Sequence, residues 1–126
     1  MKITHIGLYV TDLEKARDYY MTYFGAVSNE KYVNDKGFSS YFLRFDTETS
    51  LELMHHVNLE EVHHLDKSSG WHHLAFSVGN KEAVLALTER ITADGYELYS
   101  EPRTTGDGYF ESCVADPDGN RIEITV

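Results

Sequence analysis

The segment H-I-G-L-Y-V at residues 5–10 returns in altered form as H-L-A-F-S-V at residues 73–78. Each copy alternates two kinds of side chain, as a strand does when only one of its faces is packed. Each is followed by a stretch with helical spacing that stops at a glycine, Gly25 in the first half and Gly95 in the second. Strand-like runs separated by turn residues follow in both halves. This similarity at a long period indicates one structural unit used twice.

Alternation and turn residues also place the remaining elements. In the first half we expect a strand over 2–10, a helix opened by Thr11, and strands near 26–33, 38–46 and 50–57. In the second half we expect a strand over 71–79, a helix capped by Asn80, and strands near 96–101, 108–116 and 121–126. Thr11 with Glu14 matches a capping box. The predicted fold class is α+β, with two tandem β-α-β-β-β modules whose curved mixed sheets enclose a cavity.

The composition fits an ordinary globular domain. The chain has 126 residues, 41% hydrophobic and 25% charged. This length makes one domain and leaves no room for two full-sized ones. We therefore expect a single domain over 1–126, with one module over 1–57, a polar connector over 58–70 and a second module over 71–126.

The charge balance excludes some partners. Lys and Arg number 11 against 21 Asp and Glu, a net charge of −10 that disfavours nucleic acid and anionic membrane surfaces. No apolar run is long enough to span a bilayer, and the first ten residues are unlike a secretory leader. The single Cys113 cannot close an internal disulfide and fits a reducing compartment. The cytoplasm is the expected location.

Alternation decides which polar residues lie opposite the helix of each module. One His and one Glu of each half fall on that face: His5 and Glu52, then His73 and Glu123. On the last strand Ile122, Ile124 and Val126 are expected to face the helix.

Two imidazoles and two carboxylates converging on one cavity suit a divalent metal such as zinc or nickel. A cation also removes the cost of burying two carboxylates together. The sequence therefore predicts one divalent ion per site, held by His5, Glu52, His73 and Glu123.

Further residues share these faces or lie near them. Tyr9, Met54, His56 and Trp71 are candidate substrate contacts, and His56 is also a candidate support for the ligands.

Other residues receive structural assignments. By alternation His72 points away from His73, His63 and His64 are expected in solvent, and Cys113 is expected to be a buried, inert thiol without a basic neighbour. The glycine-rich run at 104–109 is either a plain connection or a lid.

Four motifs carry a resemblance to a known family. They are H-I-G-L-Y-V-T-D-L-E-K-A from residue 5, L-E-L-M from residue 51, H-H-L-A-F-S-V from residue 72, and D-P-D-G-N-R-I-E-I from residue 116. Together they resemble the vicinal oxygen chelate superfamily, particularly its glyoxalase I-like branch, over essentially the whole chain.

The resemblance implies an activity and roles. His5, Glu52, His73 and Glu123 match the four metal ligands of glyoxalase I, with two positions left for water or substrate. The implied reaction is the lyase-type isomerisation of a hemithioacetal of a 2-oxoaldehyde through an enediolate, as in methylglyoxal detoxification. Both glutamates are candidate catalytic bases, and Glu123 matches the residue usually assigned. A homodimer is expected, since small relatives commonly pair.

Alternatives stay open. Glutathione-using bacterial members tend to carry Arg and Asn where this chain has Tyr9 and His56, so another thiol adduct or a small keto compound is equally open. An epimerase, thiol transferase or dioxygenase could use the same scaffold, although Glu52 favours an isomerase or epimerase over a dioxygenase. A non-catalytic resistance protein that sequesters a ligand would need neither metal nor base.

Overall fold

The computed structural model describes residues 1–62, 67, 69–106 and 108–126. The chain forms two compact units, residues 1–63 and 64–126. Each unit is a mixed sheet with one helix, so the predicted α+β class with two modules is confirmed. No helix among the described residues is long and apolar enough to cross a membrane.

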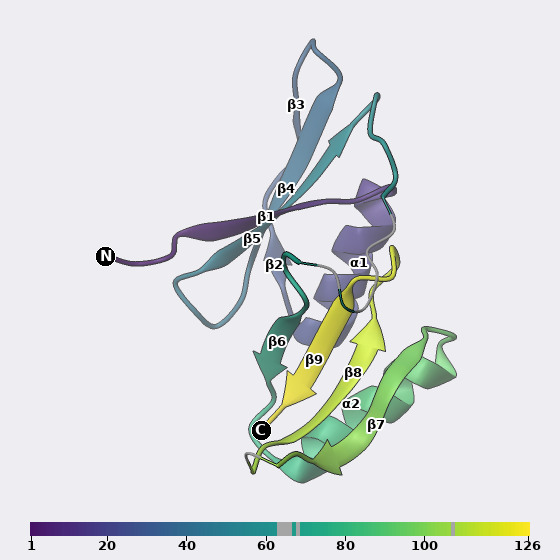
Figure 1. Cartoon of the computed structure of the whole chain (residues 1–126). Helices are drawn as coiled ribbons and strands as arrows, with labels where there is room; N and C mark the ends of the chain where they lie inside the picture. The colour runs from purple at the N-terminus through teal and green to yellow at the C-terminus, as the bar shows by residue number, and fades with distance from the viewer. Residues whose placement is uncertain (63–66, 68, 107) are drawn as a thin grey trace. The chain divides into compact units, whose positions relative to one another are not determined.

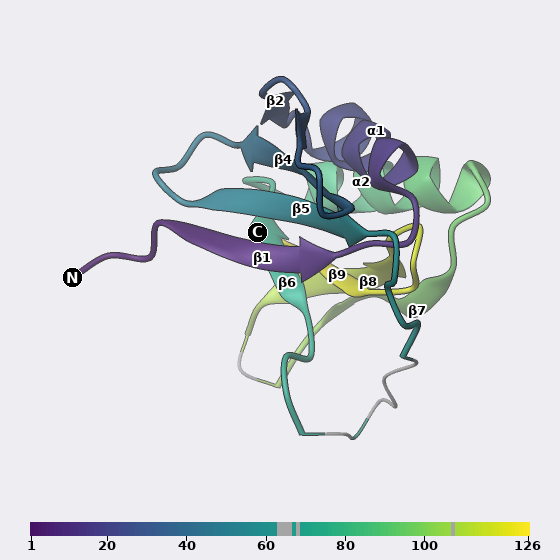
Figure 2. The same cartoon turned by 90° about the horizontal axis from the view of Figure 1, so that it is seen from above.

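Unit 1 contains one helix and five strands. They are β1 (His5–Tyr9), α1 (Leu13–Phe24), β2 (Val27–Ser28), β3 (Tyr32–Val33), β4 (Phe38–Arg44) and β5 (Ser50–His56). The strand order is β1-β5-β4-β2, and β3 also pairs with β4. Strand β5 lies between β1, to which it is parallel, and β4, to which it is antiparallel (Figure 2).

Unit 2 repeats this topology. Its elements are β6 (Leu74–Ser77), α2 (Lys81–Ala93), β7 (Leu98–Thr104), β8 (Phe110–Ala115) and β9 (Arg121–Thr125). The order β6-β9-β8-β7, with β6 parallel to β9, matches β1-β5-β4-β2 of unit 1 strand for strand (Figure 1). The last strand of each module therefore lies at the centre, beside the first.

Helix α1 begins one residue later than the sequence pattern suggested. Asp12, not Thr11, is its N-cap, and the Asp12 carboxylate accepts a hydrogen bond from the backbone N–H of Lys15 at 2.9 Å. The expected capping box is therefore wrong, because Glu14 makes contacts outside the helix instead. Gly25 ends the helix as predicted, in the left-handed conformation with φ 66°.

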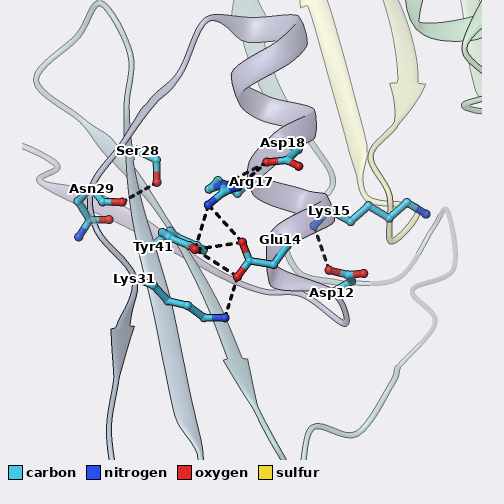
Figure 3. A network of polar contacts seen from close by, with 9 residues as sticks. All are labelled: Asp12, Glu14, Lys15, Arg17, Asp18, Ser28, Asn29, Lys31 and Tyr41. Carbon is cyan, nitrogen blue, oxygen red and sulfur yellow. Dashed lines mark hydrogen bonds and ion pairs between the residues drawn. The ribbon is translucent and has the colours of Figure 1, made fainter.

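Glu14 joins α1 to the sheet through a polar clamp, defined as Glu14, Arg17, Lys31 and Tyr41 (Figure 3). The Glu14 carboxylate accepts hydrogen bonds from Lys31 Nζ at 2.7 Å and from the Tyr41 hydroxyl at 3.0 Å. Arg17 lies 3.2 Å from the same carboxylate and donates to the Tyr41 hydroxyl at 3.0 Å. The hydrogen bond from Lys31 is the main cause that lowers the pKa of Glu14, and burial is the main cause that raises the pKa of Tyr41.

The strand expected over 26–33 is divided into β2 and β3, both paired with β4. Asn29 causes the interruption, because its side-chain oxygen accepts the N–H of Phe42 at 2.7 Å, replacing a ladder bond.

In the second half, Asn80 caps α2 as predicted, accepting from Ala83 N at 2.8 Å.

Each unit has its own core on the helix side of its sheet. Among the described residues, the largest fully buried side chains are Val10, Tyr19, Tyr20, Leu43 and Leu53 in unit 1 and Val84, Ile91, Ser112, Val114, Ile122 and Ile124 in unit 2. Val126 was expected beside Ile122 and Ile124 but is 42% exposed, because β9 ends at Thr125 and alternation no longer holds beyond it. The opposite face of each sheet carries the candidate site residues.

Candidate metal centre

In unit 1 the first predicted ligand pair comes together across β1 and β5. Glu52 is paired with Gly7, and His5 lies two residues earlier on the same face of β1. The His5 Nε2 and Glu52 Oε2 atoms are 3.8 Å apart, and the Glu52 side chain is 17% exposed. On the other side of Glu52, Phe42 is its partner on β4 and contacts the His5 ring edge to face, with centroids 5.4 Å apart.

In unit 2 the second pair has the same construction. Glu123 on β9 is paired with Ala75, and His73 lies two residues before Ala75. The His73 Nε2 and Glu123 Oε2 atoms are 3.3 Å apart, and the Glu123 side chain is 19% exposed. Strand β6 begins at Leu74, so His73 stands just outside the shorter strand and not within the expected 71–79.

The two pairs are therefore equivalent in strand register. In each unit the His lies two residues before the residue that pairs with the Glu, and the Glu is on the central strand. Among the described residues of each unit, no three His, Cys, Asp or Glu side chains lie together in a way that could hold a metal ion. Each unit thus supplies two donors, one imidazole nitrogen and one carboxylate.

Gly7 leaves room for Met54 on the site face of unit 1. A Cβ at Gly7 would lie 2.8 Å from Met54 Cε, so the thioether end of Met54 lies over the glycine, next to Glu52. Tyr9 is paired with Met54 and is half exposed. These two predicted substrate contacts are therefore neighbours on the site face.

The other two predicted contacts lie differently. His56 occupies the end of β5, two residues beyond Met54, and its Nδ1 accepts the backbone N–H of Asn58 at 3.1 Å. Trp71 precedes β6 and is 90% exposed, so within the described structure nothing fixes its indole beside His73.

The expectation for His72 is wrong. Its ring does not point away from His73: the two Nδ1 atoms are 2.9 Å apart, and the rings meet edge to face with centroids 5.2 Å apart. The reason is that both residues precede β6, where strand alternation does not operate.

Cys113 has a basic neighbour that the sequence interpretation missed. On β8 it is paired with Glu123, and Arg121 lies on the adjacent β9. Burial is the main cause that raises the pKa of the Cys113 thiol, and a hydrogen bond from Arg121 opposes it. The signal was available, because a hairpin about the turn formed by Asp116 and Asn120 pairs Cys113 with Glu123 and so places Arg121, two residues before Glu123 on the same face, diagonally opposite Cys113.

The remaining candidates divide by position. His63, His64 and Asp107 lie outside the described residues, so the expectations for the two histidines and for a complete 104–109 lid are not addressed. The described ends of that segment are tied together, since Thr105 N donates to Tyr109 O at 2.8 Å.

Comparison with known proteins establishes the family. The model of the Glyoxalase/Bleomycin resistance protein/Dioxygenase superfamily matches residues 2–124. The chain belongs to this superfamily. The resemblance drawn from the sequence motifs is thereby confirmed at the level of the superfamily.

Relatives in this superfamily fall into two groups by length. YqjT of Bacillus subtilis (strain 168), an uncharacterized protein, is 32% identical over 95% of this chain and 94% of its own length. Lactoylglutathione lyase GLX1 of Arabidopsis thaliana is 28% identical over 98% of this chain, which spans 43% of the plant protein. The chain is therefore less than half as long as this plant enzyme.

Solved structures agree with this grouping. Glyoxalase I from Zea mays superposes with a TM-score of 0.80 at 26% identity, covering 98% of this chain and 44% of the maize chain. A glyoxylase/bleomycin resistance protein/dioxygenase domain from Frankia sp. EAN1pec reaches a TM-score of 0.84 over 100% of this chain and 97% of its own, at 19% identity. The latter likeness concerns the fold alone.

Proposed function

We propose that this chain is a metal-dependent glyoxalase I-like lyase, acting on a small substrate with vicinal oxygens such as the hemithioacetal of a 2-oxoaldehyde. The observation that carries the proposal is the equivalent His–Glu pair on the central strand of each unit. A relative named as a lactoylglutathione lyase supports the choice of reaction. We also propose that the two modules act as one domain.

The donor set fits a divalent ion. Two donors bound to one zinc ion at about 2.0–2.2 Å, at angles near 90–110°, stand roughly 3–3.5 Å apart. The His–Glu separations of 3.3 and 3.8 Å lie at or near that range. Imidazole and carboxylate donors are also those that zinc and nickel accept. We therefore propose one ion per site, held by His5, Glu52, His73 and Glu123.

The ion would supply Lewis-acid stabilisation of the negative charge that develops on the two substrate oxygens. The chain supplies the proton transfer. A glutamate carboxylate removes the proton from the carbon next to the carbonyl, and then returns it to the neighbouring carbon, so no net proton is gained or lost. We assign this role to Glu123, because it is the position that matches the usual base in the resemblance to the glyoxalase I-like branch.

The surroundings of the pairs bear on the substrate. Tyr9 and Met54 lie on the same face as Glu52, and neither offers a cation to a carboxylate. Because these two positions supply no cation for the carboxylates of glutathione, another thiol adduct and a small keto compound are to be compared with glutathione as substrates.

Metal analysis is the decisive experiment. Elemental analysis of gently purified protein should find one divalent ion per chain, and stripped protein should bind zinc or nickel more tightly than about millimolar, as functional sites do. His5→Ala and His73→Ala should each weaken binding strongly. His55→Ala is the matched control, because its Nδ1 lies 3.0 Å from the Val10 carbonyl and contributes no proposed ligand. Failure of the wild type to bind either ion at millimolar concentration would overturn the ligand assignment.

A hemithioacetal panel then separates the enzyme from its rivals. Turnover with methylglyoxal adducts of glutathione and of other thiols supports the lyase. A protein that holds metal but turns over none of them is another vicinal oxygen chelate enzyme, and one that binds a ligand without metal is a sequestering protein.

Assembly is a separate part of the proposal. We expect a homodimer, and light scattering at micromolar concentration that finds only a 14.4 kDa species would contradict it.

A further inference from the structure

We infer that Thr4 and His72 are positioning residues, each holding the Nδ1 atom of the histidine that follows it so that Nε2 is presented to the metal. This inference rests on the proposed metal site. It concerns two residues that the family motifs leave outside the ligand set.

The first observation is a contact at the start of β1. Thr4 Oγ1 lies 3.1 Å from His5 Nδ1, a hydrogen-bond distance, and His5 Nε2 faces Glu52. The backbone carbonyl of Thr4 accepts the N–H of Ser50 at 3.0 Å, so Thr4 is anchored to β5. The hydroxyl is therefore held beside the ring by the same strand that carries Glu52.

The second observation repeats the first in unit 2 with different chemistry. His72 Nδ1 lies 2.9 Å from His73 Nδ1, and His73 Nε2 faces Glu123. The near-perpendicular rings, at 81°, bring the two nitrogens together without stacking. In both units the residue immediately before the His contacts the Nδ1 atom of that His, which is the ring nitrogen that does not face the carboxylate.

Imidazole chemistry explains why this matters. A neutral imidazole carries one proton, so a ring that gives its Nε2 lone pair to a metal must keep its proton on Nδ1. That Nδ1–H then needs an acceptor, and an acceptor fixes both the tautomer and the ring orientation. The Thr4 hydroxyl oxygen can accept it, and so can His72 Nδ1 when the proton of His72 is on Nε2.

The two positions therefore make different demands on a substitution. At position 4 any hydroxyl suffices, whereas at position 72 the acceptor must lie where Nδ1 of an imidazole lies. Serine preserves the first and asparagine the second, because the Asn side-chain oxygen reaches nearly the same point. Valine and leucine remove the acceptor while keeping comparable bulk.

The test is zinc affinity of stripped protein, measured by competition with a chelator. Thr4→Val and His72→Leu should each weaken binding by about 10–100-fold, the usual effect of losing such a partner. Thr4→Ser and His72→Asn should stay within about threefold of the wild type. Thr22→Val, an exposed threonine on α1, is the matched control and should bind as the wild type does.

A spectroscopic readout separates positioning from a general structural role. In zinc-loaded protein, NMR should find the Nδ1-bound protons of His5 and His73 protected from exchange, and Thr4→Val should expose that of His5 alone. Cobalt-substituted protein should change its visible spectrum in Thr4→Val and His72→Leu but not in the serine and asparagine variants.

The outcomes distinguish the two proposals. If the wild type binds no zinc, the proposed function fails, and this inference fails with it. If the wild type binds zinc and Thr4→Val and His72→Leu bind equally well with unchanged spectra, the metal site stands and the positioning role is overturned. If only one of the two variants weakens binding, the role holds in that unit and is refuted in the other.

Discussion

The two units share a backbone plan but surround their His–Glu pairs differently. In unit 1, Glu52 lies between Gly7 and Phe42, which offer it no polar side chain. In unit 2, Glu123 lies between Ala75 and Cys113, with Arg121 on its own strand. The geometry of the His–Glu pair is alike in both copies, while the side chains beside the glutamate differ. Equivalent positions in the two units therefore need not have equivalent roles.

The units differ again where the helix is tied to the sheet. Register makes Tyr41 of β4 and Ser112 of β8 equivalent, since each precedes the residue paired with the central Glu. Tyr41, itself buried, donates to the half-exposed Glu14 carboxylate, whereas Ser112 lies 2.6 Å from the Thr88 hydroxyl in the core. One position thus performs the same task through an ionic clamp in one unit and a buried hydroxyl pair in the other.

The largest expected effect tests whether the two glutamates differ. Glu123→Gln keeps the size of the side chain and one oxygen donor but loses the proton acceptor. Its turnover should fall by about 10²–10⁴, the usual contribution of a positioned base, while bound metal is largely retained. Glu52→Gln should lose less. Kinetics and metal content measured on both variants check this, and a dead Glu52→Gln beside a near-normal Glu123→Gln would reverse the assignment.

The next effect concerns the buried hydroxyl pair of unit 2. Thr88→Val should lower the free energy of unfolding by about 1–3 kcal/mol, because the fully buried Ser112 loses its 2.6 Å partner. Adding Ser112→Ala should recover part of the loss, since no unpaired hydroxyl is then left behind. Urea unfolding measures both.

Thr92→Val is the matched control for this pair. The Thr92 hydroxyl bonds backbone carbonyls of its own helix and is nearer the surface, so the change should stay within about 0.5 kcal/mol. Equal losses at positions 88 and 92 would mean that the hydroxyl pair contributes nothing of its own.

A smaller effect is expected from making Gly7 like its counterpart Ala75. In Gly7→Ala the new Cβ would meet Met54 Cε at 2.8 Å, and the flexible end of Met54 can move aside. The stability loss should therefore be about 1 kcal/mol, the low end for overpacking, and KM should change more than turnover. The double variant Gly7→Ala/Met54→Ala should not show this overpacking loss, and an unchanged KM in the single variant would separate Met54 from the substrate.

The repeat made the fold and the positions of the His–Glu pairs predictable from sequence. His5, Glu52, His73 and Glu123 could be placed on their faces because alternation is a local rule and two copies constrained each other. What could not be predicted lay where that rule stops. His72 precedes its strand, so alternation gave the wrong direction for its ring.

Long-range contacts were the other limit. The Asp12 cap displaced Thr11 because Glu14 had partners on β4 and at Lys31, far away in the sequence. A capping-box pattern contains no information about such partners. The binding of one ion by His5, Glu52, His73 and Glu123 is a prediction that metal titration tests.

The smallest expected effect is the pH dependence that the clamp gives to unit 1. The pKa of Glu14 is lowered from 4.5 in the folded state, mainly by the hydrogen bond from Lys31. Its contribution to stability is therefore complete above pH 4.5 and is lost as pH falls through the lower folded value. Because the Glu14 side chain is 47% exposed, solvent screening keeps the contribution below about 1 kcal/mol.

Glu14→Gln should therefore be slightly less stable than the wild type at pH 7, and the difference should shrink as pH falls below 4.5. Glu82→Gln is the matched control, because Glu82 holds the same place in the first turn of α2, after the Asn80 cap, as Glu14 holds after Asp12. Both variants lose the same favourable interaction with the helix N-terminus. Urea unfolding at a series of pH values should thus show a larger difference for Glu14→Gln than for Glu82→Gln. Equal curves would mean that the helix dipole accounts for the whole effect and that the contacts to Lys31 and Tyr41 add nothing to stability.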